Sequence, residues 1–142
     1  YRVDSIDVID GFFQIVHVQN KGAAFGLGAG TEYAIWFFLA FTVVALGVIL
    51  SMLIQLPAND RWMTSSLALI NGGAIGNAID RADKQSVTDF LRFYTDHPSL
   101  RPWLLENLGT AEYPSFNVAD IAIVGGVIAF LAHQIFIGEP EE

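Results

Sequence analysis

Cysteine is absent from this chain of 142 residues, which excludes disulfide bonds, thiolate metal ligands and a cysteine nucleophile. Charge is also scarce, because charged residues make up 15% of the chain but about 25% of an ordinary soluble domain. Positive charge is the scarcest: seven Lys and Arg stand against fifteen Asp and Glu, and the net charge is −8. A nucleic acid partner would need a basic surface, so we expect none.

Several motifs of enzyme chemistry are missing as well. The chain has no H-E-x-x-H pair, and His17, His97 and His133 lie far apart, so we expect no metal site. There is no G-x-S-x-G elbow, and the spacing of Ser86 and Lys84 does not favour a Ser/Lys nucleophile. Since no Walker A or dinucleotide-binding fingerprint occurs either, we expect no cofactor.

Three long stretches of the chain carry no charge: positions 33–59, 62–79 and 121–138. A helix that crosses the hydrocarbon core of a bilayer needs roughly 17–25 mostly apolar residues. The sequence therefore predicts a mostly α membrane protein of one domain, residues 1–142, built as a transmembrane helix bundle. The predicted spans are 33–56, 62–80 and 118–137.

The second predicted span is the most polar of the three, since it contains three hydroxyl residues, two asparagines and three glycines. Polar residues inside a span usually face protein or water. The spacing of Gly72 and Gly76 is typical of membrane helices that approach one another closely. We therefore expect this helix to pack against another span.

Two segments lie outside the predicted spans. Residues 1–32 contain a strand-like run at Phe12–Val18 after an Asp-Gly turn signal, and residues 81–117 contain another at Val87–Phe93. Residues 99–108 carry one apolar helical stripe, with Ser99 able to cap the start and Gly109 able to end the helix. Two interpretations stay open for this short helix: a movable lid, or a helix that rests on the membrane interface.

Two carboxylates stand at predicted element boundaries among apolar neighbours. Asp89 lies in the strand-like run, and Asp120 opens the third span. Each has an ordinary interpretation: a strand residue facing water for Asp89, and an acid that complements the helix dipole for Asp120. If the second and third spans are adjacent and antiparallel, both carboxylates lie on one side of the membrane. A close pair of carboxyl groups can perform acid–base hydrolysis, as in aspartic proteases.

Four sequence blocks between residues 20 and 120 resemble, in order, signature blocks of the lipoprotein signal peptidases (signal peptidase II). They are NKGAAFG (Asn20–Gly26), GGAIGNAIDR (Gly72–Arg81), VTDF (Val87–Phe90) and FNVAD (Phe116–Asp120). The resemblance implies a membrane-embedded aspartic endopeptidase. Such an enzyme removes the signal peptide of a prolipoprotein on the N-terminal side of a diacylglyceryl-modified cysteine.

The resemblance also assigns roles to individual residues. It implies a catalytic pair of Asp89 and Asp120, and polar residues that hold the substrate backbone or orient the pair: Asn20, Asn77, Arg81 and Asn117. Asp80 matches a signature acid that is expected to pair with Arg81 or its neighbours. Asn77 and Arg81 are four residues apart, so they share one face of a helix.

Further expectations follow from the family. The 1–32 segment is expected to form a small extracytoplasmic β-cradle and 99–108 a short periplasmic helix, in a monomer embedded in the bilayer of the bacterial inner membrane, with its active site near the periplasmic face. A family first span with an Asp and a Lys is missing before Tyr1. In the family's topology, six of the seven Lys and Arg lie outside, so the positive-inside count disagrees. The alternatives are a non-catalytic helix-bundle scaffold or transporter, and an inactive relative.

Overall fold

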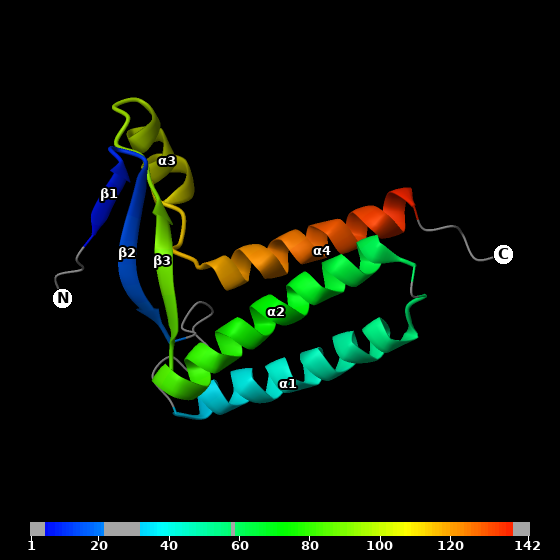
Figure 1. Cartoon of the computed structure of the whole chain (residues 1–142). Helices are drawn as coiled ribbons and strands as arrows, with labels where there is room; N and C mark the ends of the chain where they lie inside the picture. The colour runs from blue at the N-terminus through cyan, green and yellow to red at the C-terminus, as the bar shows by residue number, and fades with distance from the viewer. Residues whose placement is uncertain (1–4, 22–31, 58, 138–142) are drawn as a thin grey trace. The chain divides into compact units, whose positions relative to one another are not determined.

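The computed structural model describes residues 5–21, 32–57 and 59–137 (Figure 1). The chain forms two compact units, and the organisation as one domain stays a prediction. We call them the sheet unit, Tyr1–Asn20 with Thr88–Asn117, and the helix unit, Lys21–Val87 with Val118–Glu142. Each unit is built from two segments that are distant in the sequence.

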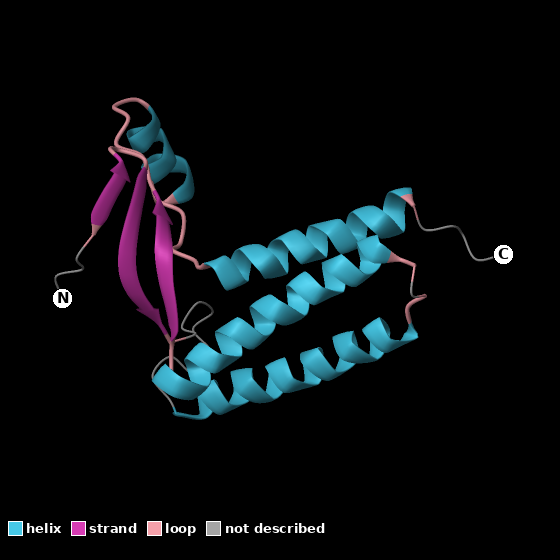
Figure 2. Ribbon diagram, in the orientation of Figure 1, coloured by secondary structure: helices cyan, strands magenta, loops and turns pink. Residues whose placement is uncertain are grey.

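The sheet unit contains three strands in the order β1 (Ile6–Ile9), β2 (Phe13–Asn20) and β3 (Val87–Phe93), shown in Figure 2. β1 and β2 are antiparallel and joined by a tight turn at Gly11, whose φ of 70° suits glycine. β3 is antiparallel to β2, because the Tyr94 amide after the end of β3 donates to the carbonyl of Phe12 before the start of β2. Both strands predicted from the sequence are confirmed.

Aromatic side chains stack on one another across the sheet unit. The rings of Phe13 and Phe93 stack with centroids 4.8 Å apart, and Phe93 stacks in turn on Phe116 at 5.9 Å. Phe12 meets Phe93 edge to face at 5.5 Å. Such pairs contribute about 0.5–1.5 kcal/mol each beyond the area they bury, so three segments of the chain are joined by one stack.

The short helix predicted at 99–108 is confirmed as α3 (Leu100–Leu108), and Gly109 ends it with a φ of 74°. The predicted capping by the Ser99 side chain is wrong. Ser99 stands at the N-cap position but makes no side-chain cap bond, because its backbone is helical, whereas a capping side chain requires extended dihedrals. On the predicted apolar stripe, Leu100, Trp103 and Leu108 are exposed.

The helix unit consists of α1 (Glu32–Gln55), α2 (Arg61–Lys84) and α4 (Val118–Phe136), with α2 packed between the other two (Figure 1). Two helices are long and apolar enough to cross a membrane, Trp36–Gln55 within α1 and Val118–Phe136, among the described residues. Their apolar side chains are mostly exposed, as expected for surfaces that face lipid. The predicted second span is a helix, but its lower hydropathy leaves its crossing of the membrane a prediction.

Glycines bring α2 and α4 into close contact. A methyl group added at Gly73 would lie 2.7 Å from Ile123 and would collide with the main-chain carbonyl of Ala119, and one at Gly126 would lie 2.7 Å from the carbonyl of Ser66. The sequence attributes this role to Gly72 and Gly76. It is right for Gly76, whose added methyl group would lie 3.4 Å from Cβ of Ala119 on α4, and wrong for Gly72, which has no atoms within 4 Å of its added methyl group. One residue turns a helix by about 100°, so Gly72 points away from α4.

Polar contacts join the N-terminal end of α2 to the C-terminal part of α4. The Asp60 side chain caps α2 by accepting the amide of Met63 at 2.9 Å, and its other oxygen lies 3.5 Å from Nε2 of His133. The Trp62 indole donates to the carbonyl of Ala129 at 2.8 Å. α2 and α4 are therefore antiparallel neighbours, an arrangement that enters the sequence-based interpretation only as a condition.

The polar residues of α2 are only partly turned toward protein. Ser66 and Asn77 are buried, as predicted, but Thr64 and Ser65 are exposed. The Thr64 hydroxyl donates to the main-chain carbonyl of Asp60 at 2.7 Å. A hydroxyl bonded back to its own helix makes its hydrogen bond locally, so Thr64 does not need a partner on another helix.

Candidate active site

Asp89 is the third residue of β3 and is only 3% exposed. Its two carboxylate oxygens each accept a side-chain amide: Oδ2 accepts Nδ2 of Asn20 at 3.0 Å, and Oδ1 accepts Nδ2 of Asn117 at 3.0 Å. This burial overturns the alternative in which Asp89 is a strand residue facing water. A buried carboxylate needs such donors, and both come from the blocks that carry the family resemblance.

The strand arrangement explains how these three residues meet. The antiparallel pairing of β2 and β3 places Asn20, at the end of β2, beside Asp89 near the start of β3. On the other side, the amides of Phe90 and Leu91 both donate to the carbonyl of Phe116, at 3.0 and 2.9 Å. Asn117 follows Phe116 directly, so this main-chain contact places the side-chain amide of Asn117 within hydrogen-bond distance of Asp89.

Asp120 lies in the first turn of α4, within the helix unit. Its Oδ1 accepts Nδ2 of Asn77 on α2 at 2.9 Å, and Asn77 is 7% exposed. The position also suits the ordinary interpretation, since an acid at a helix N-terminus complements the dipole. The amide contact goes further, because it joins Asp120 to a residue 43 positions away in another signature block.

The remaining predicted residues stand in the last turns of α2. The Arg81 guanidinium lies over the ring of Phe38 on α1, with Cζ 5.5 Å from the ring centroid. Asp80 pairs with Lys84, with Oδ1 2.9 Å from Nζ. Lys84 is a neighbour of Arg81, and the resemblance implies that Asp80 pairs with Arg81 or one of its neighbours. Ser86 donates to the main-chain carbonyl of Lys84 at 3.3 Å.

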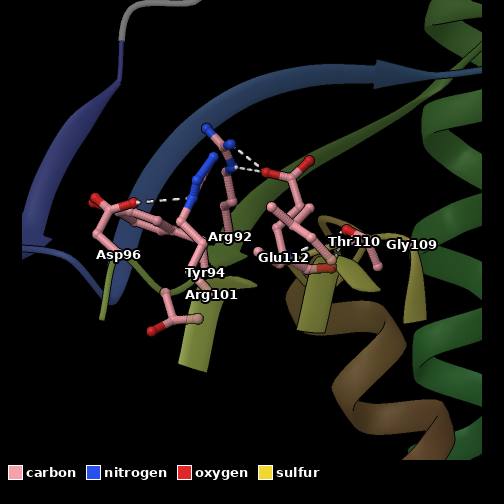
Figure 3. A pocket seen from close by; sticks show the side chains of 10 residues that line it. Arg92, Tyr94, Asp96, Arg101, Gly109, Thr110 and Glu112 are labelled. Atoms are coloured by element: carbon pink, nitrogen blue, oxygen red, sulfur yellow. Dashed lines mark hydrogen bonds and ion pairs between the residues drawn. The ribbon is translucent and has the colours of Figure 1, made fainter. Parts of the chain in front are cut away.

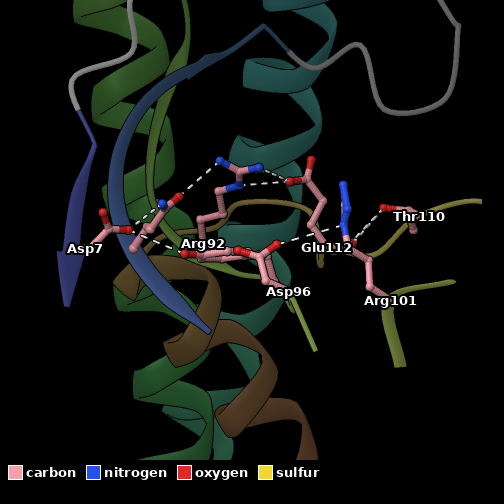
Figure 4. Close-up of polar contacts among 8 residues, drawn as sticks. Asp7, Arg92, Asp96, Arg101, Thr110 and Glu112 are labelled. Atoms are coloured by element: carbon pink, nitrogen blue, oxygen red, sulfur yellow. Dashed lines mark hydrogen bonds and ion pairs between the residues drawn. The ribbon is translucent and has the colours of Figure 1, made fainter. Parts of the chain in front are cut away.

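A separate polar hollow of about 340 Å³ lies in the sheet unit, between the end of β3, α3 and residues 109–112 (Figure 3). Arg92 donates to Glu112 at 2.9 Å (Figure 4). It also donates to Gln14 at 3.1 Å, and its guanidinium lies over the ring of Tyr94. Partial burial, and then the charge of Asp7, raises the pKa of the Tyr94 phenol above its ordinary value. These contacts join the strands to the loop at residues 109–112. The charged residues that line the hollow therefore stabilise the sheet unit, and we assign no substrate to the hollow.

Chemically, each unit therefore presents one carboxylate oriented by asparagine amides. An amide N–H that donates to a carboxylate holds the orientation of that group. Lys21, in the first signature block, is described, but residues 22–26 of that block lie outside the described residues.

Comparisons with known proteins agree with the four blocks. A sequence model of the signal peptidase (SPase) II family matches residues 1–136. The chain belongs to the signal peptidase II family. The lipoprotein signal peptidase of Maridesulfovibrio salexigens is 44% identical over 126 residues, which cover 87% of this chain and 72% of the relative. The lipoprotein signal peptidase of Geobacter sulfurreducens is 43% identical over 131 residues, which cover 92% of this chain and 74% of that relative.

Solved structures show the same likeness. One, titled as a bacterial membrane enzyme at 1.9 Å resolution, matches with a TM-score of 0.74 at 28% identity and covers 94% of this chain and 76% of its own. Members of the signal peptidase II family are proteases, so the predictions of family and of an enzyme are confirmed. The scaffold and transporter alternatives are not favoured.

Sequence reasoning missed several contacts around these residues. It gave no role to Phe38, which is one of eleven phenylalanines and stands in a continuous apolar run. It also set aside His133 as a lone histidine, whereas His133 lies beside Asp60. The one signal in the sequence is that His133 stands near the end of one predicted helix while Asp60 precedes the start of another.

Proposed function

We propose that this member of the signal peptidase II family cleaves prolipoproteins with Asp89 and Asp120 as its catalytic pair. The cleaved bond precedes a diacylglyceryl-modified cysteine, and the products are the signal peptide and the lipidated protein. The observation that supports this most is shared by both carboxylates: each accepts hydrogen bonds from asparagine amides of the signature blocks. The function requires the two carboxyl groups to approach each other in the working enzyme.

In the proposed reaction, the two carboxyl groups share one proton, because like charges at close range oppose double ionisation. The ionised carboxylate takes a proton from water as the water oxygen attacks the scissile carbonyl carbon. The protonated carboxyl donates its proton to the carbonyl oxygen. The tetrahedral intermediate then collapses and the C–N bond breaks. The carboxyl that took the proton from water donates it to the leaving nitrogen, and the other carboxylate takes back a hydroxyl proton as the C=O bond re-forms.

The other predicted residues support this chemistry. Asn20 and Asn117 orient Asp89, and Asn77 orients Asp120. Arg81 stays protonated at all relevant pH values, so it donates hydrogen bonds to the substrate backbone and transfers no proton. Asp80 balances positive charge at this end of α2 through Lys84. No step calls for a metal or another cofactor.

We further propose that the chain works as a monomer in the bacterial inner membrane. α1, α2 and α4 cross the bilayer, and the sheet unit stands on the periplasmic side as the predicted cradle. The exposed apolar surfaces of α1 and α4 support the placement in lipid. A lipidated substrate can then reach Asp89 and Asp120 from the bilayer while water enters from outside.

α3 is proposed as a lid over the catalytic pair. Its Trp103 is exposed, and Gly109 ends the helix in the left-handed conformation. Trp103→Ala is therefore expected to lower kcat severalfold while the melting temperature stays unchanged. A helix that only rests on the membrane interface would instead leave kcat unchanged.

The central test is the exchange of each carboxyl group for a carboxamide. Asp89→Asn and Asp120→Asn should each lower turnover of a lipidated prolipoprotein by about 10³-fold or more, because members of one catalytic unit are individually indispensable. Turnover is followed by gel shift of the purified protein in lipid, and folding by thermal unfolding.

Matched controls come from carboxylates of the same units. Asp96 in the sheet unit and Asp83 on α2 are exposed, and Asp96→Asn and Asp83→Asn should retain turnover. Near-normal turnover by a folded Asp89→Asn or Asp120→Asn variant would remove that residue from the catalytic pair.

A further inference from the structure

One cation near the proposed active site rests on an aromatic ring. Arg81 is half-buried in the last turns of α2, and its Cζ lies 5.5 Å from the centroid of the Phe38 ring on α1. A guanidinium at this distance is attracted by the negative face of the ring. The attraction is strongest where water is scarce, and a charge at membrane depth needs such compensation.

Phe38 differs from the other phenylalanines around it on α1. Phe37 is 68% exposed and Phe41 is 66% exposed, whereas Phe38 is half-buried. The edge of one ring meets the face of the other between Phe37 and Phe38, with centroids 5.9 Å apart. Phe38 is thus turned toward α2 and is supported by its neighbour.

The register of α2 relates this contact to the proposed catalytic residues. Arg81 and Asn77 are four residues apart, so they lie on one face of α2. The Asn77 amide binds Asp120 at 2.9 Å. The Phe38 ring therefore contacts the Arg81 guanidinium, which lies one helical turn from the Asn77 amide that binds Asp120.

A flat guanidinium donates hydrogen bonds only within its own plane. Because Cζ of Arg81 lies over the face of the Phe38 ring, the ring restricts where the guanidinium can lie and so the directions in which its N–H groups can point. Leucine or methionine at position 38 would fill similar space without offering a negative face. The contact thus orients Arg81 in a way that apolar packing alone does not.

We propose that Phe38 is a positioning residue for Arg81: its ring holds the guanidinium in the orientation that the peptidase reaction uses. The inference rests on the proposed role of Arg81 at the active site. Phe38 itself touches neither the substrate nor the reacting atoms. Its loss should therefore reduce activity through Arg81 and through no other group.

The test compares Phe38→Leu, Phe38→Met and Phe38→Tyr, with Phe41→Leu as a matched control on an exposed position of the same helix. Turnover of a lipidated prolipoprotein gives kcat and KM, and thermal unfolding reports stability. Phe38→Leu and Phe38→Met should lower kcat/KM about tenfold, in line with a desolvated cation–π contact. Phe38→Tyr, which keeps the ring, and Phe41→Leu should stay within about twofold of the starting protein.

A double-mutant cycle separates positioning from packing. In an Arg81→Gln background, Phe38→Leu should change kcat/KM by less than about twofold, because the cation that it positions is gone. An equal loss in both backgrounds, or failure of Phe38→Tyr to retain activity, would overturn the proposal. If Phe38→Leu does not fold, Phe38→Met and Phe38→Tyr decide between the same outcomes.

Failure of this inference is distinguishable from failure of the proposed function. Full activity of Phe38→Leu beside inactive Asp89→Asn and Asp120→Asn would remove Phe38 alone. Full activity of those two Asp variants would remove the catalytic pair. Full activity of Arg81→Gln would remove the role of Arg81 and, with it, that of Phe38.

Discussion

The sheet unit and the helix unit each orient one carboxylate with asparagine amides, but the two frameworks differ. In the sheet unit, Asp89 receives Asn20 and Asn117 from 69 and 28 residues away, through paired strands and an aromatic stack. In the helix unit, Asp120 receives Asn77 through two helices that touch at glycines. The amide–carboxylate hydrogen bond therefore depends on strand pairing and aromatic stacking in the sheet unit. In the helix unit it depends on glycines, which let α2 and α4 approach closely.

Among the variants that compare the two frameworks, the largest effect should come from a single methyl group in the helix unit. Gly73→Ala would press a Cβ against the main-chain carbonyl of Ala119 and against Ile123 at 2.7 Å. Backbone cannot yield as a side chain can, so α4 must shift beside Asp120, at a typical overpacking cost of about 1–3 kcal/mol. We expect at least tenfold lower turnover and a lower melting temperature, measured by gel shift and thermal unfolding.

Gly72→Ala is the matched control, because its added methyl group meets nothing within 4 Å. Alanine is the better helix former by about 0.5–1 kcal/mol, so this variant should retain turnover and unfold at the same or a higher temperature. Equal damage from Gly72→Ala and Gly73→Ala would show that helix contact at Gly73 does not hold α4.

A smaller effect is expected from the polar tie of the sheet unit. Arg92→Ala removes the hydrogen bonds to Glu112 and Gln14. The side chains are partly exposed to water, so the free energy of unfolding should fall by only about 1 kcal/mol. Thermal unfolding of Arg101→Ala provides the comparison, since the Arg101 contact to Asp96 is 3.9 Å long and exposed. A loss from Arg101→Ala as large as that from Arg92→Ala would contradict this account.

The smallest effect separates two roles of Asp60 at the far end of α2. Asp60→Ala removes both the cap on Met63 and the partner of His133, and loss of an N-cap costs about 1 kcal/mol. Asp60→Ser keeps a capping oxygen and loses only the His133 contact. We expect thermal unfolding to show most of the loss in Asp60→Ala and little in Asp60→Ser. An equal loss in both variants would make the His133 contact the stronger of the two.

Local structure could largely be predicted from the sequence. The strand Val87–Phe93 and the helix at 99–108 stand where the residue pattern places them, because β-branched and aromatic runs and an apolar helical stripe are local signals. Of the two glycines predicted to face another helix, Gly76 does and Gly72 does not, and the tightest contact is at Gly73. Spacing along a helix shows that glycines can form a contact but not which of them faces the neighbouring helix.

The residues of the candidate site were named from the sequence blocks alone, but their partners were not. A chain without cysteine, with three charge-free runs and four ordered signature blocks, determines the membrane class, the family and the residues to test. The pairing of Asn20 and Asn117 with Asp89, of Asn77 with Asp120, and of Phe38 with Arg81 was decided only by the tertiary structure. Hydrogen bonds and ring contacts act over a few ångströms, so they depend on how distant segments pack, which residue order alone does not record.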